Sequence, residues 1–286
     1  MVGSQSPARA GLRAEGFAEA TLSSQRAHLR AALSWAKSVG LLGEVPEIPK
    51  ARMPKGTPHM RGRPITTEEF ERMVKAVPKE RPKDADAWRR YLQGLWLSGL
   101  RIAESLALSW DAEASVSVDL TGRFPALRIQ AAAEKGNRDR RLPLTPDFAT
   151  WLLATPEVER QGFVFKLGSR RLDENMSVKR VSRIVSAIGK AANIIVNKAA
   201  KKSASAHDFR RAFGTRWSAK VRAADLQVLM RHASIETTLR FYVGHEADEV
   251  AERLYRDNPG GKGDGANNRQ CDTMIRLNDS GDCQRE

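Results

Sequence analysis

Apolar residues recur every three or four positions along most of the chain, which predicts a mainly helical protein. The first such stripe runs from 21 to 39, where Leu29, Leu33 and Trp35 fall on neighbouring turns and Gly40 follows as a stop. Residues 1 to about 20, rich in Ala, Gly, Ser and Arg, show no such stripe. We therefore expect one helix in the first part of the chain.

The helical pattern resumes after residue 64. Thr66 or Thr67, followed by Glu69, is typical of a helix N-cap. Apolar residues at 88, 92, 95 and 96 predict the next helix, which Gly99 can end in a left-handed cap. Further helices are expected at about 101–109, 146–154, 176–196, 206–219, 223–231, 234–242 and 247–256.

Between residues 124 and 144 the pattern changes to strands. Residues 124–130 and 140–144 are expected to pair through a turn at 135–139, because polar and turn-forming residues separate two short apolar segments. The fold class is therefore α+β, mainly α with a small antiparallel β-sheet.

Composition divides the chain into four parts. Residues 1–49 form a helical arm, and 50–63 form a linker rich in proline and basic residues. The main domain covers 64–257. Residues 258–286, rich in Gly, Asn and Asp, are expected to be a disordered tail.

The charge of the chain points to a polyanionic partner. Its net charge is +14, and residues 166–222 hold fifteen Lys and Arg against three acidic residues. Such clustering favours nucleic acid over general solubility, although charge alone also fits a ribosome-like or merely soluble basic protein.

The two cysteines, Cys271 and Cys283, both lie in the tail, so neither a disulfide framework nor a metal site is expected. A reduced, cytoplasmic protein is the simplest interpretation. No apolar run approaches the length of a membrane span, and no signal peptide is expected at the N-terminus.

Some polar residues could form an anion site. His207 and Arg210 are three residues apart on an expected helix and so share one face, where imidazole and guanidinium can bind an anionic oxygen. Glu104 lies three residues after Arg101 and can orient it by an ion pair. Taken singly, each pair fits a non-functional interpretation better: a helix cap region with a solvated arginine for the first, and an ordinary surface ion pair for the second.

Tyr242 is a candidate nucleophile. It is one of only three tyrosines and follows His232 by ten residues. A phenol with a pKa of about 10 is a weak nucleophile at neutral pH unless cations stabilise the phenolate. A buried tyrosine with a bonded hydroxyl is the alternative. Lys135, in the basic hairpin turn, could place its ammonium beside a leaving oxygen or be a simple surface lysine.

The order and context of these residues resemble the tyrosine recombinase (phage integrase) family. The segment Leu97-Ser98-Gly99-Leu100-Arg101-Ile102-Ala103-Glu104 resembles the first arginine box of the family. The segment Ser205-Ala206-His207-Asp208-Phe209-Arg210-Arg211 resembles the start of the second box, and residues 229–242 resemble its end. The resemblance extends over about residues 60–257.

The resemblance implies a DNA recombinase or integrase that needs no metal, ATP or other cofactor. Tyr242 would attack a DNA phosphodiester, form a 3′-phosphotyrosyl bond and release a 5′-hydroxyl. Arg101 and Arg210 would clamp the non-bridging oxygens. A second attack, by the 5′ end of another strand, would complete the exchange.

The same resemblance assigns the remaining residues. Lys135 would protonate the leaving oxygen, His207 would act as base or proton shuttle, and His232 would bond the phosphate. Glu104 and Asp208 would be supports. Contacts to the DNA backbone are expected from Arg138, Arg140, Arg141, Arg211, Lys201, Lys202 and Arg231.

Two departures from the family pattern stand out. Arg231 occupies a position that is most often glycine in the family, and it is expected to contact DNA. Residues 1–49 would be a truncated remnant of the helical core-binding (arm) domain. The family further implies double-stranded DNA as partner, a homotetramer on that DNA and accessory DNA-bending proteins. It leaves open whether the chain acts in the bacterial nucleoid, in chromosome resolution, or is encoded by a phage or other mobile element.

Two other functions stay open at this point. A type IB topoisomerase shares the chemistry but relaxes DNA without exchanging strands, and a decayed integrase would bind DNA without cutting it. The segment 247–256 would pack within its own protomer or dock on a neighbour.

Overall fold

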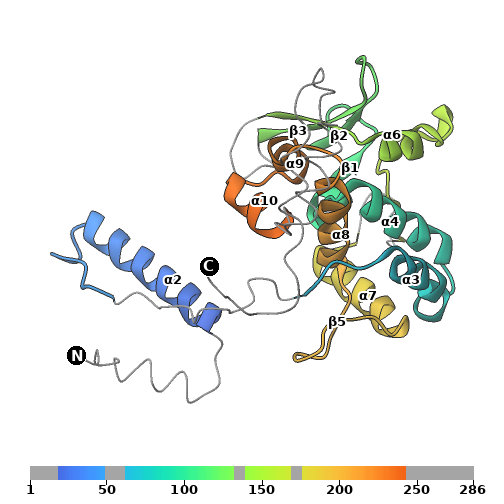
Figure 1. The fold of residues 1–286 in the computed structure, drawn as a ribbon. Coiled ribbons are helices and arrows are strands. Elements are labelled where there is room, and N and C mark those ends of the chain that lie inside the picture. The colour runs from blue at the N-terminus through green and yellow to red at the C-terminus, as the bar shows by residue number, and fades with distance from the viewer. Residues whose placement is uncertain (1–18, 49–61, 132–138, 169–175, 243–286) are drawn as a thin grey trace, which may run out of the picture. The chain divides into compact units, whose positions relative to one another are not determined.

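The structure is a computed structural model that describes residues 19–48, 62–131, 139–168 and 176–242 (Figure 1). Contacts divide the chain into two units, Met1–Arg61 and Gly62–Glu286. The expected mainly helical fold with a small sheet is confirmed. Among the described residues, no helix combines the length and the hydropathy that a membrane span requires.

The first unit contains helix α2 (Glu19–Ser38), close to the bounds that the apolar stripe predicted. Gly40 follows with φ +78°, a conformation that favours glycine. Leu22 is buried, whereas Leu29 and Trp35 are exposed.

Helices α3 (Thr67–Glu80) and α4 (Ala85–Ser98) open the second unit. Thr66 caps α3 in the predicted way: the Glu69 amide donates to Thr66 Oγ1 at 3.2 Å, and the Thr66 amide donates to Glu69 Oε2 at 3.0 Å. Arg63 adds two bonds to the Glu69 carboxylate, at 2.7 and 2.6 Å. Helix α4 ends at Gly99 with φ +60°, also as predicted.

The later helices follow the predicted order, with two shortened ends. They are α5 (Ile102–Ala107), α6 (Pro146–Leu153), α7 (Val178–Ala191), α8 (Ala206–Ser218), α9 (Ala223–Met230) and α10 (Ile235–Tyr242). A single 3-10 turn, η2, covers Glu157–Glu159. Helix α5 ends early because the residues directly after it pair as strand β1, and strand pairing satisfies the same backbone groups. Helix α7 ends at a turn in which Asn193 takes φ 54°, and strand β5 follows the turn.

The main sheet has four strands in the order β1 (Leu108–Ser109), β2 (Val116–Asp119), β3 (Ala126–Ile129) and β4 (Arg140–Pro143). Strands β3 and β4 are antiparallel as predicted, with Leu127 opposite Leu142. Strands β1 and β2 were not predicted, and they pair in parallel. A second hairpin joins β5 (Ile195–Asn197) to β6 (Lys202–Ser203).

Most buried side chains of the second unit belong to one large cluster. Helix α3 packs on α7 and α4, and α4 packs on α8 (Figure 1). The cluster includes Trp88 and Tyr91 of α4 and Phe209 of α8. A separate, small cluster holds α9, and its buried members are Phe213, Leu226 and Met230.

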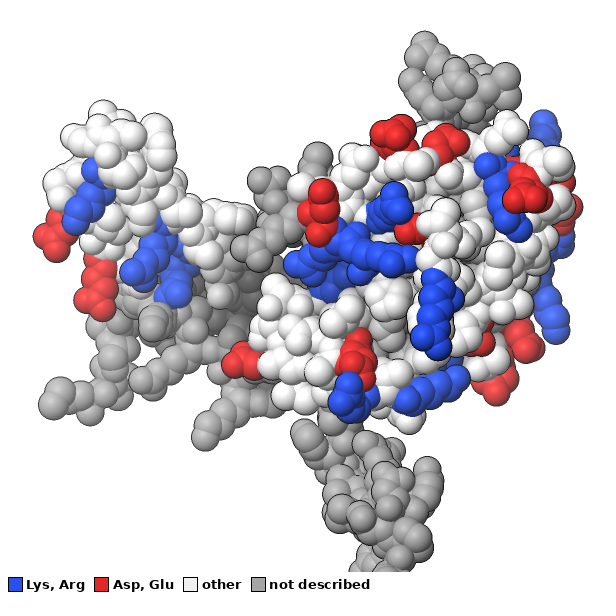
Figure 2. Space-filling view, turned by 90° about the horizontal axis from the view of Figure 1, so that it is seen from above, with Lys and Arg blue, Asp and Glu red and all other residues white. Residues whose placement is uncertain are grey.

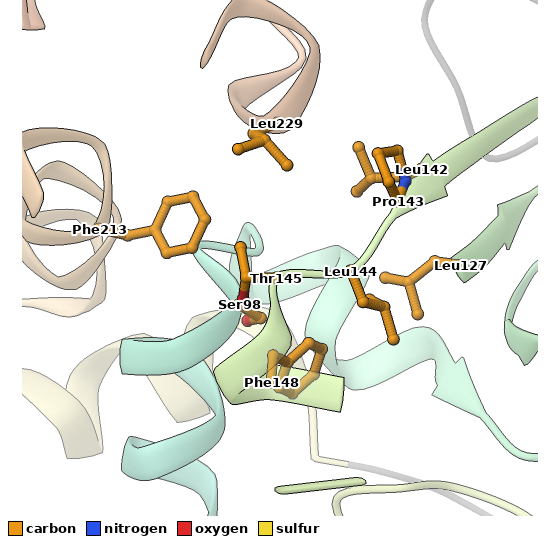
Figure 3. Close-up of a pocket in the computed structure, with 9 residues that line it drawn as sticks. All are labelled: Ser98, Leu127, Leu142, Pro143, Leu144, Thr145, Phe148, Phe213 and Leu229. Atoms are coloured by element: carbon orange, nitrogen blue, oxygen red, sulfur yellow. The ribbon is translucent and has the colours of Figure 1, made fainter. Parts of the chain in front are cut away.

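A narrow apolar gap lies where α9 meets the rest of the unit (Figure 3). Phe213 of α8, Leu229 of α9 and Leu142 of β4 surround it, together with Phe148 of α6. Its volume is about 10 Å³, at the lower limit for holding one water molecule. The gap is therefore a packing defect beneath α9 and too small for a ligand.

Candidate active site

Arg210 is held at the point where three helices meet. It lies on α8 with 5% of its surface exposed. Its Nη1 donates to the Gly99 carbonyl at 2.6 Å, and its Nη2 donates to the Met230 carbonyl. A Cβ at Gly99 would come within 2.4 Å of the Phe213 ring, so close packing and φ +60° both require glycine there. The ends of α4 and α9 thus fix the plane of the guanidinium.

Arg101 stands just before α5, with 47% of its side chain exposed. The expected ion pair is present: Arg101 Nη1 is 2.8 Å from Glu104 Oε1. The Arg101 amide also donates to Glu104 Oε2 at 2.7 Å. Arg101 Nη2 donates to the Arg231 carbonyl at 3.5 Å. Glu104 therefore orients Arg101 and caps α5 at once.

Glu104 has a second cationic partner, Arg231. This arginine ends α9 in the left-handed conformation, with φ 49° and ψ 48°. Its side chain is 3% exposed, and its Nη2 pairs with Glu104 Oε2. Burial acts to raise the pKa of Glu104, but the charge of Arg231 and the bonds from Arg101 outweigh it and lower this pKa. Attraction to Glu104 thus turns Arg231 inward, and the predicted contact of Arg231 with DNA stays a prediction.

His232 follows directly and joins the same cluster. Its Nδ1 lies 2.9 Å from Oγ1 of Thr238, a residue that is fully buried. Burial, together with the charges of Arg210, Arg101 and Arg231, lowers the pKa of His232 to about 4. The imidazole is therefore neutral at pH 7 and can donate a single N–H to an anion.

The first turn of α8 holds Asp208 and His207. Asp208 is fully buried and accepts from the Ser205 amide at 2.9 Å and from Ser205 Oγ at 2.7 Å. It also pairs with Arg211. Partial burial and the charges of Arg211 and Arg210 lower the pKa of His207, although its side chain remains exposed to solvent. Asp208 thus fixes the start of the helix that carries His207.

The structure brings Arg101, Arg210 and His232 into one cluster, and it places His207 one turn before Arg210 on α8. Tyr242 is the last residue of α10, the helix that packs on α9. Its side chain lies outside what the structure describes, as do the whole of Lys135 and Arg138.

Basic side chains also line an open groove of about 520 Å³ along the sheet. Arg140 and Arg141 of β4 are both exposed, and Arg141 lies 3.5 Å from Asp119. Arg128 of β3 pairs with the same carboxylate at 3.1 Å. Figure 2 shows Lys and Arg side chains gathered in the middle of one face. Arg128 was not among the DNA contacts predicted from the sequence. Its exposure between buried Leu127 and Ile129 nevertheless follows the alternation of a half-buried strand.

The other expected DNA contacts differ in exposure. Lys201 is exposed in the turn of the β5–β6 hairpin, and Lys202 is partly exposed. The side chain of Arg211, in contrast, is 12% exposed and pairs with Asp208. The hairpin lysines therefore present charge to a ligand more readily than Arg211 does.

Some groups of the site carried no signal that the sequence could provide. The carbonyls of Gly99 and Met230 bind Arg210, and any residue type has a carbonyl. Thr238 belongs to the same group, because its bond to His232 depends on how α9 and α10 meet.

Comparison with known proteins places this site in context. A model of the phage integrase family matches residues 63–249. The tyrosine recombinase XerC of Chlamydia caviae is 29% identical over 195 residues, which cover 65% of this chain and 55% of XerC. The chain therefore spans about half the length of this curated relative.

Solved structures share the fold at lower identity. The integrase of the transposon Tn1549, in complex with transposon right-end DNA, gives a TM-score of 0.58 at 18% identity, over 86% of this chain and 81% of the other. A lambda integrase dimer bound to a COC′ core site gives a TM-score of 0.58 at 17% sequence identity. The match covers 82% of this chain and 78% of the lambda integrase chain. The mainly helical fold with a small sheet is thus that of these proteins.

Proposed function

Because this chain belongs to the phage integrase family, we propose that it is a site-specific recombinase that cuts and rejoins double-stranded DNA through a covalent 3′-phosphotyrosine. The convergence of Arg101, Arg210 and His232 beside α10, the helix that Tyr242 ends, carries this proposal.

Strand cleavage proceeds as one substitution at phosphorus. Tyr242 Oη forms a bond to the phosphorus while the bond to the 5′ oxygen breaks. The phenolic proton passes to His207, and Lys135 supplies a proton to the leaving oxygen. Arg101 and Arg210 stabilise the charge that builds on the non-bridging oxygens, because a guanidinium matches the planar spacing of two such oxygens.

His232 supports the phosphate in its neutral form. With Thr238 Oγ1 donating to Nδ1, the Nε2 atom carries the hydrogen and donates it to a non-bridging oxygen. Its low pKa keeps this state constant through the neutral range.

Tyr91 is ruled out as a competing nucleophile. It is fully buried in α4, with its hydroxyl 2.9 Å from Ser105 Oγ, and burial raises its pKa. The remaining alternative is Tyr255, which lies outside the described residues.

The groove along the sheet and the β5–β6 hairpin supply phosphate contacts. Arg128, Arg140 and Arg141 line the first, and Lys201 and Lys202 belong to the second. Binding should weaken with salt by a slope of about −0.9 per phosphate contacted. A slope near zero in a salt series would contradict this interface.

We further propose how the chain assembles on DNA and on which DNA it works. The active form is a homotetramer on DNA, aided by accessory DNA-bending proteins, and it works in the cytoplasm on phage or other mobile-element DNA. Sedimentation with and without bound DNA tests the tetramer: a protein that stays monomeric on every cleaved site would contradict it.

A covalent-trapping experiment tests the chemistry. The chain is incubated with nicked duplexes from a random-sequence pool, in which a short strand diffuses away after cleavage, and protein–DNA adducts are isolated under denaturing conditions. The native chain should form adducts, and Tyr242→Phe should not. Equal trapping by both would contradict Tyr242 as nucleophile.

The trapped sequences then allow a second assay. Recombinant products from two sites indicate a recombinase, whereas relaxation of supercoils without recombinants would indicate a topoisomerase.

A further inference from the structure

We propose that Arg231 is a positioning residue for strand cleavage, which shares the Glu104 carboxylate with Arg101 and ties the end of α9 to the start of α5. The inference rests on the proposed function for its reaction but on the described contacts for its geometry. It assigns Arg231 to the inside of the site and not to the DNA interface.

The backbone at Arg231 is the first observation. A left-handed residue at the end of a helix is usually glycine, because a Cβ there comes too close to the following carbonyl oxygen. Arg231, with φ 49°, is one of three non-glycine residues with positive φ among those described. Unlike Asn193 and Lys201, the other two, it is buried. A strained position that carries a large buried side chain is a candidate for a functional role.

The contacts of Arg231 reach both catalytic arginines through neighbouring atoms. Its guanidinium pairs with Glu104, its carbonyl accepts from Arg101, and the preceding carbonyl, of Met230, accepts from Arg210. Residues 230 and 231 thus position two arginines that come from α8 and from the loop before α5. The next residue is His232, so a shift of this backbone would move the whole cluster.

The charges explain why an arginine serves better here than a neutral residue. Glu104 is needed to orient Arg101, but a carboxylate that paired with Arg101 alone would compete with the phosphate for the same guanidinium. Arg231 takes up one of the two carboxylate oxygens, Oε2. Arg101 therefore keeps its orientation while the negative charge beside it is largely neutralised.

The charge of Arg231 also contributes to the electrostatic potential at His232. The charged groups that face this imidazole are Arg210 from α8, Arg101 before α5 and Arg231 itself, with Glu104 of α5 bound to the last two. Removing one positive charge should make protonation of His232 easier. This titration reports on the geometry without requiring DNA cleavage.

The experiment compares Arg231→Gln, which removes the charge, with Arg231→Lys, which keeps it. Both variants keep a side chain on the left-handed backbone, so their strain is alike. Arg222→Gln serves as the control, because Arg222 loses the same charge from an exposed pair with Asp225. Each protein is assayed for adduct formation at saturating DNA, for DNA affinity, and for the pKa of His232 by NMR.

We expect Arg231→Gln to slow adduct formation by about tenfold or more, since small displacements of positioned groups carry such losses. DNA affinity should change by less than about threefold, because the side chain is buried. The His232 pKa should rise in this variant. Arg231→Lys should recover most of the rate and keep the low pKa, and Arg222→Gln should match the native chain.

Two results would overturn the inference. One is native rate and native His232 titration in Arg231→Gln. The other is a loss of DNA affinity with an unchanged rate at saturation, which would make Arg231 a DNA contact. If the native chain forms no adduct, the proposed function fails together with the role in cleavage, and the His232 pKa of the two variants then decides only whether Arg231 belongs to the cluster around His232. If Arg231→Gln does not fold, Arg231→Gly, which relieves the strain, takes its place.

Discussion

The two sides of the candidate site are held in different ways. Arg210 and His207 lie on α8, whose Ala206, Phe209 and Ala212 are buried in the large core together with α4. His232 and the end of α10 depend on α9, which rests on a smaller cluster, with three buried side chains among the described residues, and borders a packing gap. Regions with few buried apolar contacts open at lower free energy than the core.

This difference indicates that the two sides of the site have different roles. Under the proposed function, the side that carries Arg210 is the more rigid part of the phosphate site, whereas the side that carries His232 and Tyr242 adjusts at a modest free-energy cost. Arg210 and the pair of Glu104 with Arg231 are the links between them. A reaction in which a tyrosine must approach and leave one phosphorus is suited to such an arrangement.

The largest effect should come from cutting the link at Arg210. Arg210→Ala should lower adduct formation by about 10²- to 10³-fold, the usual loss when a transition-state donor is removed. It should also cost about 1–3 kcal/mol of stability, since two buried carbonyls lose their donor. Adduct assays and urea unfolding measure both. Native-like stability would show that the two sides do not meet through this residue.

Two leucine substitutions, one in each buried cluster, would test how the two clusters differ in their effects on stability and on adduct formation. Leu92 and Leu226 are both fully buried, the first in the large cluster and the second in the small one. Leu92→Ala should lower the global free energy of unfolding by about 2–5 kcal/mol. Leu226→Ala should lower it less but should slow adduct formation more. The reverse ranking in these two assays would contradict this difference in roles.

Acid should weaken the folded state through the histidine side. The pKa of His232 is about 4 in the folded protein against an ordinary 6.5, so the unfolded chain binds an extra proton between these values. The free energy of unfolding should therefore rise with pH through this window. As pH falls through the same window, the contribution of His232 to stability should be lost. His207, whose pKa is also lowered, acts in the same direction.

Urea unfolding of the native chain and of His232→Gln, measured at intervals between about pH 4 and pH 7, isolates this contribution. The variant should show the shallower pH dependence. Identical slopes would mean that His232 titrates normally in the folded state.

The smallest effect is expected outside both sides of the site. Arg128 is exposed, pairs with Asp119 and lines the sheet groove. Arg128→Ala should reduce the salt slope of DNA binding by about 0.9 and weaken affinity a few-fold, without changing the adduct rate at saturating DNA. A change in that rate would extend the active site to the sheet.

Local signals in the sequence were sufficient for most helices and for one strand pair. Thr66 with Glu69 marked the start of α3, Gly99 marked the end of α4, and the β3–β4 pairing followed from alternation around a turn. Each of these depends on contacts within a few residues along the chain. The parallel β1–β2 pair was missed because its two-residue strand β1 is too short to show a period.

The residue types of the site were equally determined by the sequence, as the ordered set Arg101, His207, Arg210, His232 and Tyr242. How these side chains are held became clear only from contacts between distant parts of the fold. The sequence led us to place Arg231 against DNA, but its partner Glu104 lies 127 residues away. Packing of α8 on α4, and of α9 on α8, brings such groups together. No local pattern encodes a contact between distant residues, because its free energy depends on the burial that the whole fold creates.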